Sequence, residues 1–318
     1  MIRPPAPITA PVLVLVGPTA IGKTELSLRI AEAFQAEIIS MDSMQVYRHM
    51  DIGTAKASPE ERRRVVHHLI DIVDPDEQYD AARFVHDALE AVTSIHAREK
   101  IPLITGGTGL YLSSLINGIF DSIDVQPDVR DRLRNRLRQE GKGVLHRELM
   151  TVDQESGQRI HCNDTQRILR GLEIYYTTGV PWSEHLRRQQ DAMPRPRFTR
   201  ILLLGLTCAR EVLYDRIKRR SISIMRDEFA LEVQWLLGQG YTGDLPAMQS
   251  IGYRHMLACL AGTWDRETAT AVLIRDTRRY AKRQMTWFRN QQQVHWHPID
   301  QTEDIFAAIA SFLETREG

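Results

Sequence analysis

Short apolar runs recur along this chain, and most are followed by segments whose apolar residues have helical spacing. Runs without polar alternation are typical of strands buried on both faces of a parallel sheet. Between two of them, Tyr79–Lys100 repeats apolar side chains at helical intervals, with Phe84, Ala88 and Val92 on one face. The pattern predicts an α/β fold. The expected strands are Val12–Val16, Ala36–Met41, His67–Val73, Ile101–Thr105 and Arg200–Leu206.

The pattern changes near the middle of the chain, where helical periodicity replaces the short apolar runs. Val125–Gly141 is amphipathic, and Asn163 or Asp164 is placed to cap a further helix. The basic, proline-rich stretch Pro194–Arg197 then leads back to a strand. We therefore expect a mainly helical insertion domain at residues 121–197, and an α/β core with C-terminal helices at residues 1–120 and 198–318.

The first apolar run leads into a glycine-containing loop of defined chemistry. Gly17, Gly22, Lys23 and Thr24 occupy every fixed position of the pattern G-x-x-x-x-G-K-[ST], between a predicted strand and a predicted helix. In such a loop, backbone N–H groups and the positive end of the helix converge on phosphate oxygens, and the hydroxyl can hold Mg²⁺. The pattern predicts a P-loop NTPase-like fold, but it does not specify which phosphate is bound.

Two further predicted strands end in polar residues. Asp42 follows Ala36–Met41, and Thr108 follows the paired glycines after Ile101–Thr105. Because ligands bind at the C-terminal ends of parallel strands, we expect Asp42 and Thr108 to face the phosphate site. The structural alternatives are a capping aspartate and a glycine turn that only ends the strand. Asp71 is a weaker candidate for holding Mg²⁺, because turn aspartates are common at such positions.

Composition narrows the class of protein without naming a partner. The chain has 318 residues, of which 42% are hydrophobic, and it carries 41 basic and 41 acidic side chains. Total charge therefore gives no argument for a nucleic-acid or membrane partner. Three scattered cysteines without a C-x-x-C pair argue against a disulfide framework or a zinc site and favour the cytoplasm. Met1–Pro11 contains four prolines and is expected to be irregular, and the apolar run after it is too short to span a bilayer.

Basic residues concentrate near the C-terminus. Residues 270–295 contain six basic side chains and one acidic side chain. On the helix predicted there, Arg275, Arg279, Lys282 and Arg289 form a stripe separate from the apolar and aromatic positions that recur every seven residues. Such a stripe beside aromatics can follow a phosphate backbone. Taken alone, it is explained more simply by a solvated helix face.

Seven sequence blocks together resemble the bacterial tRNA dimethylallyltransferases, also called tRNA isopentenyltransferases. They extend over nearly the whole chain, and although a P-loop is shared by many unrelated enzymes, this ordered set is specific. The blocks are GPTAIGKT (17–24), DSMQVYRHMDIGTAK (42–56), HHLID (67–71), GGTGLYL (106–112), NDTQRILRGLE (163–173), MQSIGYR (248–254) and YAKRQMTWFR (280–289).

The resemblance implies that the chain transfers a dimethylallyl group from dimethylallyl diphosphate to N6 of the adenosine 3′-adjacent to the anticodon of certain tRNAs. It also implies Mg²⁺ as cofactor and a cytoplasmic monomer that contacts the anticodon stem–loop. An adenosine in that loop is already poorly paired, so extruding it from its stack costs little.

The resemblance further assigns roles to individual residues. Asp42 would accept the N6 proton, and Thr108 would help to orient the amine or the diphosphate. The diphosphate would be held by Gly17, Thr19, Ala20, Ile21, Gly22, Lys23, Thr24 and Arg220, with Mg²⁺ on Thr24. The tRNA contacts would be Asp42, Ser43, Met44, Gln45, Thr108, Arg130, Gln166, Arg167, Ile168, Leu169, Arg170, Gln249, Ser250, Ile251, Gly252, Tyr253, Arg254, Lys282, Arg283, Gln284, Trp287 and Arg289.

The sequence departs from the family pattern at two places. Ile21 stands where the family usually has serine, which removes a hydroxyl but no fixed motif position. Ser221 stands where the family places an arginine expected to bind diphosphate, and a glycine expected after Met225 is missing. Our hypothesis is that Arg220 or Arg219 supplies the missing charge through a local shift.

Three other functions compete with this interpretation. A small-molecule P-loop kinase would use the insertion as a lid but would leave the basic, aromatic C-terminal half without a role. A prenyltransferase for free adenine nucleotides would not need the tRNA-type blocks, and a non-catalytic nucleotide-binding module would leave Asp42 and Thr108 unexplained. Salt dependence separates the tRNA enzyme from the kinase, since only the former should lose affinity steeply as salt rises.

Overall fold

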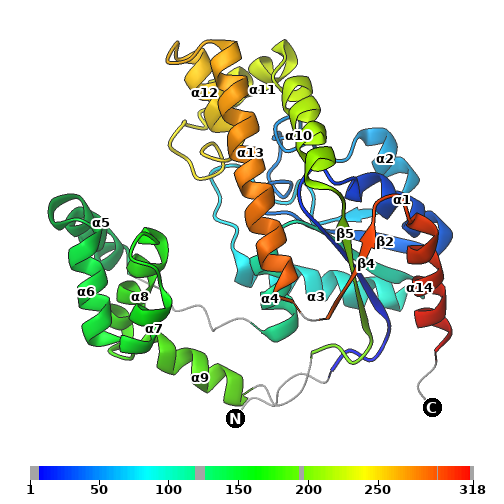
Figure 1. The fold of residues 1–318 in the computed structure, drawn as a ribbon, viewed down its shortest axis with the longest axis horizontal. Helices are drawn as coiled ribbons and strands as arrows, with labels where there is room; N and C mark the ends of the chain where they lie inside the picture. Colours follow the sequence, from blue (N-terminus) through cyan, green and yellow to red (C-terminus); the bar gives the residue numbers. More distant parts are fainter. Residues whose placement is uncertain (1–6, 119–125, 193–196, 292, 316–318) are drawn as a thin grey trace. The chain divides into compact units, whose positions relative to one another are not determined.

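Six parallel strands form one sheet in the order β3-β2-β4-β1-β5-β6 (Figure 1). The computed structural model describes residues 7–118, 126–192, 197–291 and 293–315. The sheet confirms the predicted α/β fold class, a parallel sheet flanked by helices. The strands are β1 (Val12–Val16), β2 (Ala36–Met41), β3 (His67–His68), β4 (Ile101–Gly106), β5 (Ile201–Thr207) and β6 (Val294–Pro298).

Helices cover both faces of this sheet, because the central strands are apolar on both sides. All five residues of β1 are buried. Residues of α3 (Ala81–Ala97) pack into one hydrophobic core with Val12, Val14 and Val16. On the other face, α1 (Lys23–Ala33) and α14 (Thr302–Glu314) pack with Leu13 and Leu15.

The remaining helices of this unit stand beyond the C-terminal ends of the strands or connect them (Figure 1). The longest of them is α13 (Arg266–Arg289), which packs against α10 (Arg210–Ile224) and α12 (Tyr253–Leu260). No described helix has both the length and the apolarity needed to cross a membrane. The others are α2 (Pro59–Arg64), α4 (Gly109–Asn117), α10 (Arg210–Ile224), α11 (Asp227–Gly238) and α12 (Tyr253–Leu260).

The chain divides into two compact units. Residues 117–197 belong to a helical unit, and residues 7–116 and 198–318 form the unit that contains the sheet. The helical unit has its own apolar core, in which Val129, Leu133 and Leu149 take part. Asp164, rather than Asn163, caps α8 (Thr165–Thr178), since its carboxylate accepts a hydrogen bond from the N–H of Arg167. The helices are α5 (Pro127–Glu140), α6 (Lys142–Val152), α7 (Gln154–Arg159), α8 (Thr165–Thr178) and α9 (Trp182–Ala192).

One predicted strand is largely wrong. Only His67–His68 of the expected strand His67–Val73 pairs in the sheet. Leu69 and Asp71 adopt positive φ angles of 60° and 57°, which no strand accommodates. The segment therefore leaves the sheet after His68.

Some expectations fall on residues outside the described part of the chain. These are the first six residues of the expected irregular start, Val125 of the expected amphipathic helix, and Pro194–Pro196 of the connector. The elements that were not predicted individually include α2, α4, α12, α14 and β6. Strand β6, VHWHP, contains two histidines and a proline, which a strand at the edge of the sheet tolerates.

Candidate active site

Strand pairing brings Asp42 and Thr108 together. Met41 at the end of β2 lies opposite Gly106 at the end of β4. The residues that follow then hydrogen-bond across the gap: the N–H of Thr108 donates to the carbonyl of Met41 at 3.4 Å. The N–H of Ser43 donates to Thr108 Oγ1 at 3.2 Å. Since β4 pairs with β1, the P-loop leaves the same edge of the sheet.

The P-loop turns directly into α1 at Gly22. The φ angle of Gly22 is +111°, a backbone conformation that favours glycine. The Lys23 ammonium reaches back over the loop and donates to the carbonyls of Gly17 at 2.9 Å and Pro18 at 3.0 Å. Burial lowers the pKa of Lys23 to about 8; the neighbouring Asp42 carboxylate opposes this shift and Arg220 adds to it. Lys23, Asp42 and Arg220 thus form one electrostatic cluster.

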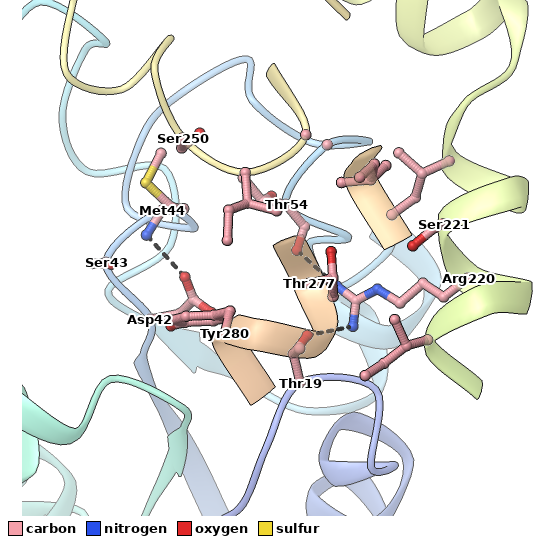
Figure 2. A pocket seen from close by; sticks show the side chains of 16 residues that line it. Thr19, Asp42, Ser43, Met44, Thr54, Arg220, Ser221, Ser250, Thr277 and Tyr280 are labelled. Carbon is pink, nitrogen blue, oxygen red and sulfur yellow. Dashed lines mark hydrogen bonds between the residues drawn. The ribbon is translucent and has the colours of Figure 1, made fainter. Parts of the chain in front are cut away.

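Two cavities meet at this cluster. The first, of about 230 Å³, is called here the phosphate-loop cavity and is lined by the P-loop residues Thr19–Ala20 and Gly22–Thr24. The second cavity, of about 260 Å³, is shown in Figure 2 and is bounded by α10, α13 and the turn before α12. The residues that line both cavities are Thr19, Asp42, Thr54, Arg220 and Tyr280.

The cluster has a polar face and an apolar face. Hydroxyl and ammonium groups of the P-loop line the phosphate-loop cavity, whereas Met44, Ile217, Ile251 and Leu273 line the second cavity. Such a division suits a ligand with an anionic end and an apolar end.

Arg220 is the cation that α10 presents to the site. It donates to Thr19 Oγ1 and to the carbonyl of Thr54, both at 3.4 Å (Figure 2). Burial lowers the pKa of Arg220, and the charge of Asp42 opposes that shift. Arg219 instead points outward, with 79% of its side chain exposed and an ion pair to Asp215. Of the two arginines considered from the sequence, only Arg220 lies in the site.

Asp42 is held by the backbone and faces hydroxyl groups. Its Oδ1 accepts a hydrogen bond from the N–H of Met44 at 2.9 Å (Figure 2). Tyr280 lines both cavities beside it. Burial, followed by the charge of Asp42, raises the pKa of Tyr280, so that its hydroxyl stays neutral. A carboxylate with one oxygen so held, next to neutral hydroxyls, is placed to accept a proton.

Comparison with known proteins identifies the family. A family model described as IPP transferase matches residues 45–291. The chain belongs to this family. The tRNA dimethylallyltransferase of Desulfotalea psychrophila is 50% identical over 307 residues, which cover 96% of this chain and 97% of the relative. That of Desulfosudis oleivorans is 45% identical over 294 residues and 92% of each chain. The resemblance noted in the sequence is thereby confirmed.

Solved structures of IPP transferases share the fold. A eukaryotic dimethylallyltransferase captured acting on tRNA has a TM-score of 0.81 and 28% identity, covering 97% of this chain and 81% of its own. The full-length tRNA isopentenylpyrophosphate transferase of Bacillus halodurans has a TM-score of 0.69 and 38% identity, covering 96% and 97%. These likenesses support the predicted P-loop-like class.

In this IPP transferase, the residues predicted to contact tRNA are distributed over the two cavities and the two structural units. Ser43, Met44, Ser250, Ile251 and Gly252 line the second cavity. Gln45 lines the phosphate-loop cavity, where its side chain accepts from Ser40 at 3.0 Å. Arg130, Gln166, Arg167, Leu169 and Arg170 belong to the helical unit, whereas Gln249, Arg254, Lys282, Arg283, Trp287 and Arg289 belong to the unit with the sheet.

Four predicted site residues turn their side chains into the protein. Ile21 and Ile168 are each 1% exposed and pack in apolar cores, and Tyr253 is fully buried. Gln284 accepts from the N–H of Thr19 at 2.9 Å and donates to the carbonyl of Gly107 at 2.9 Å. The Gln284 side chain thus ties the P-loop to the turn after β4, and it also lines the phosphate-loop cavity.

Several residues of the site were not singled out from the sequence. Thr54 and Tyr280 line both cavities, and Thr277 lines the second cavity. Thr54 and Tyr280 stand inside the sequence blocks at 42–56 and 280–289. The family resemblance of these two blocks could have identified Thr54 and Tyr280, but the predicted site residues were other members of the same blocks.

The phosphate-loop cavity has oxygen donors that fit Mg²⁺. Thr24 lies exposed at its edge, and Thr105 Oγ1 is buried there without a hydrogen-bond partner among the described residues. Mg²⁺ takes oxygen ligands and keeps several waters, so hydroxyls beside a bound diphosphate suit it. Asp71 does not contribute, because it is paired with Lys56 at 2.5 Å and Arg62 at 2.6 Å.

Proposed function

We propose that this IPP transferase transfers a dimethylallyl group from dimethylallyl diphosphate to N6 of the adenosine 3′-adjacent to the anticodon in tRNA. The observation that carries the proposal is the position of Asp42. It lies where the phosphate-loop cavity meets the second cavity, within the electrostatic range of Lys23 and Arg220. An acceptor for a proton is therefore next to a site for an anionic leaving group.

The proposed reaction is a substitution at carbon. The N6 nitrogen forms a bond to C1 of the dimethylallyl group while the bond from C1 to the diphosphate oxygen breaks. The proton released from N6 passes to Asp42, and the electron pair of the broken bond leaves with diphosphate. Thr108, whose Oγ1 already accepts from Ser43, orients the amine or the diphosphate.

The cations of the cluster act on the leaving group. Lys23 and Arg220, which are both partly buried, stabilise the negative charge that grows on the diphosphate. The remaining P-loop positions, Gly17, Thr19–Gly22 and Thr24, surround the diphosphate through their backbone. Thr24 would hold Mg²⁺, which would supply further charge stabilisation when bound. Apolar side chains of the second cavity, among them Ile217 and Leu273, contact the dimethylallyl group or the base.

The tRNA is held by both units in this proposal. Ser43 and Met44 and the turn Ser250–Gly252 contact the extruded adenosine, since they line the second cavity. Arg130, Gln166, Arg167 and Arg170 of the helical unit contact the anticodon stem–loop, as the family resemblance implies. We also propose that the protein acts as a cytoplasmic monomer, as the family resemblance implies.

The direct experiment is to incubate the purified protein with unmodified tRNA, dimethylallyl diphosphate and Mg²⁺. The tRNA is then digested, and N6-dimethylallyladenosine is sought by mass spectrometry. Its formation, dependent on the diphosphate, is the expected result. Absence of the product, together with ATP-dependent phosphorylation of a small acceptor, would instead identify a P-loop kinase. Prenylation of free adenine nucleotides but not of tRNA would contradict the proposed acceptor.

A further inference from the structure

A basic groove lies on the side of α13 that faces away from the reaction site. It consists of two adjoining hollows, of about 230 and 340 Å³, which share Arg210, Tyr214 and Lys282. One face of α13 lines the site cavities through Leu273, Thr277, Tyr280 and Gln284. The α13 residues that line the groove lie on the opposite face, about half a helical turn around the axis. The cations that line the groove are Arg210, Arg275, Arg278, Arg279, Lys282 and Arg289.

The charge of this groove is not balanced locally. Neither hollow has an aspartate or glutamate among its lining residues. Arg275 and Arg279 approach Asp276 at 3.1 and 4.0 Å. The other four cations have no carboxylate within ion-pair distance in the described part of the chain. Since the whole chain carries equal numbers of basic and acidic residues, such a concentration is a local feature of this surface.

Two of the guanidinium groups are held in place before any ligand arrives. Those of Arg210 and Arg278 each lie 4.9 Å from the centre of the Tyr214 ring. Arg278 Nε is buried and has no hydrogen-bond partner among the residues that the structure describes. Arginine presents planar donors that match phosphate oxygens, and cations fixed by stacking lose little side-chain entropy on binding. The groove therefore offers ordered donors to an anionic acceptor.

The length of the groove indicates a polymer. Its cations extend from Arg275 to Arg289, a distance of roughly 21 Å along a helix that rises 1.5 Å per residue. A single phosphate group would occupy only a small part of it, whereas several nucleotides of backbone would span it. We propose that the basic groove binds the sugar–phosphate backbone of the tRNA substrate away from the modified adenosine. This inference rests on the proposed function and adds Arg210, Arg275, Arg278 and Arg279 to the RNA contacts.

The test compares two double variants that remove the same charge. Arg210→Gln/Arg275→Gln alters the groove, and Arg63→Gln/Arg64→Gln, on exposed positions of α2 that pair with glutamates, is the control. The Kd for tRNA is measured over a range of salt concentrations, with the KM for dimethylallyl diphosphate measured in parallel. Circular dichroism monitors folding, and the single variant Arg275→Gln at an exposed position replaces the double variant should that misfold.

The groove variant should bind tRNA about 10-fold or more weakly, with its salt slope reduced by roughly 0.7–0.9 per lost phosphate contact. The KM for dimethylallyl diphosphate should not change. Equal tRNA binding by the groove variant and the wild type would overturn this inference and leave the proposed function standing. An equal loss in the control would also overturn it, because the effect would then follow total charge. Failure of the wild-type protein to bind tRNA would overturn the proposed function as well.

Discussion

The Tyr253 hydroxyl donates a hydrogen bond to Glu232 Oε1 at 2.6 Å, joining two segments that are far from the catalytic motif in the sequence. The same carboxylate accepts from three consecutive N–H groups, those of Asp51 at 3.1 Å, Ile52 at 2.8 Å and Gly53 at 3.4 Å. Gly53 lines the second cavity, and the next residue, Thr54, accepts from Arg220. Glu232 therefore positions a loop that shapes the site without touching a substrate itself.

Replacing Glu232 with Gln should lower kcat/KM by roughly 10- to 100-fold, because charge-assisted hydrogen bonds of this kind are worth about 1.5–3 kcal/mol. One carboxylate oxygen would become an amide NH2 group that faces backbone donors, and the loop would lose part of its anchor. Glu228→Gln, one turn earlier on the same helix and exposed, is the matched control and should behave as wild type. Steady-state kinetics with each substrate varied would check this. Normal kinetics in Glu232→Gln would show that the loop holds its position without the carboxylate.

Asp42→Asn should reduce turnover by about 100-fold or more, the range typical of a lost general base. The amide oxygen can still accept from the N–H of Met44, so the loop should keep its shape. Affinity for tRNA, measured by filter binding, should stay near the wild-type value. Glu228→Gln, which removes one negative charge from an exposed position of α11, serves as the control. Near-normal turnover in Asp42→Asn would remove this residue as the base.

Arg220→Gln should raise the KM for dimethylallyl diphosphate by about 10-fold or more, because a desolvated guanidinium that faces the phosphate-loop cavity is lost. Arg219→Gln removes the same charge from an exposed neighbour and should leave the KM unchanged. The comparison tests whether Arg220 replaces the arginine that the family places at the position of Ser221. Unchanged KM values in both variants would contradict the hypothesis.

The apparent affinity for dimethylallyl diphosphate should fall above pH 8. The pKa of Lys23 in the free protein is about 8, so the ammonium is charged below that pH and progressively neutral above it. Only the charged form attracts diphosphate, and kcat/KM should therefore decline up to about tenfold per pH unit on the alkaline side. Lys23→Arg, which keeps its charge over this range, should lose that alkaline limb even if its overall activity is lower. A profile that is flat from pH 7 to 10 in the wild type would contradict the assignment.

The local sequence pattern was sufficient to predict the elements whose formation depends on neighbouring residues. The continuous apolar run at β1, the P-loop that follows it and the polar residues after β2 and β4 could all be predicted. Strand ends of a parallel sheet lie at one edge, so the approach of Asp42 to Thr108 followed from their positions in the sequence. The strand expected at His67–Val73 could not be corrected in advance, since its apolar residues leave the sheet through positive φ angles at Leu69 and Asp71.

The sequence alone therefore determined the fold class, the phosphate loop and the family, because each depends on residues that are adjacent or regularly spaced. The tertiary structure decided which side chains serve the site. Gln284 and Tyr280 lie one helical turn apart on α13, yet the Gln284 amide is used to bridge the P-loop and β4 while Tyr280 lines both cavities. Likewise, only the packing of α10 selects Arg220 over Arg219. Adjacent residues on a helix, such as Arg219 and Arg220, point in different directions, whereas residues one turn apart share a face; in both cases the partners they meet come from distant parts of the chain.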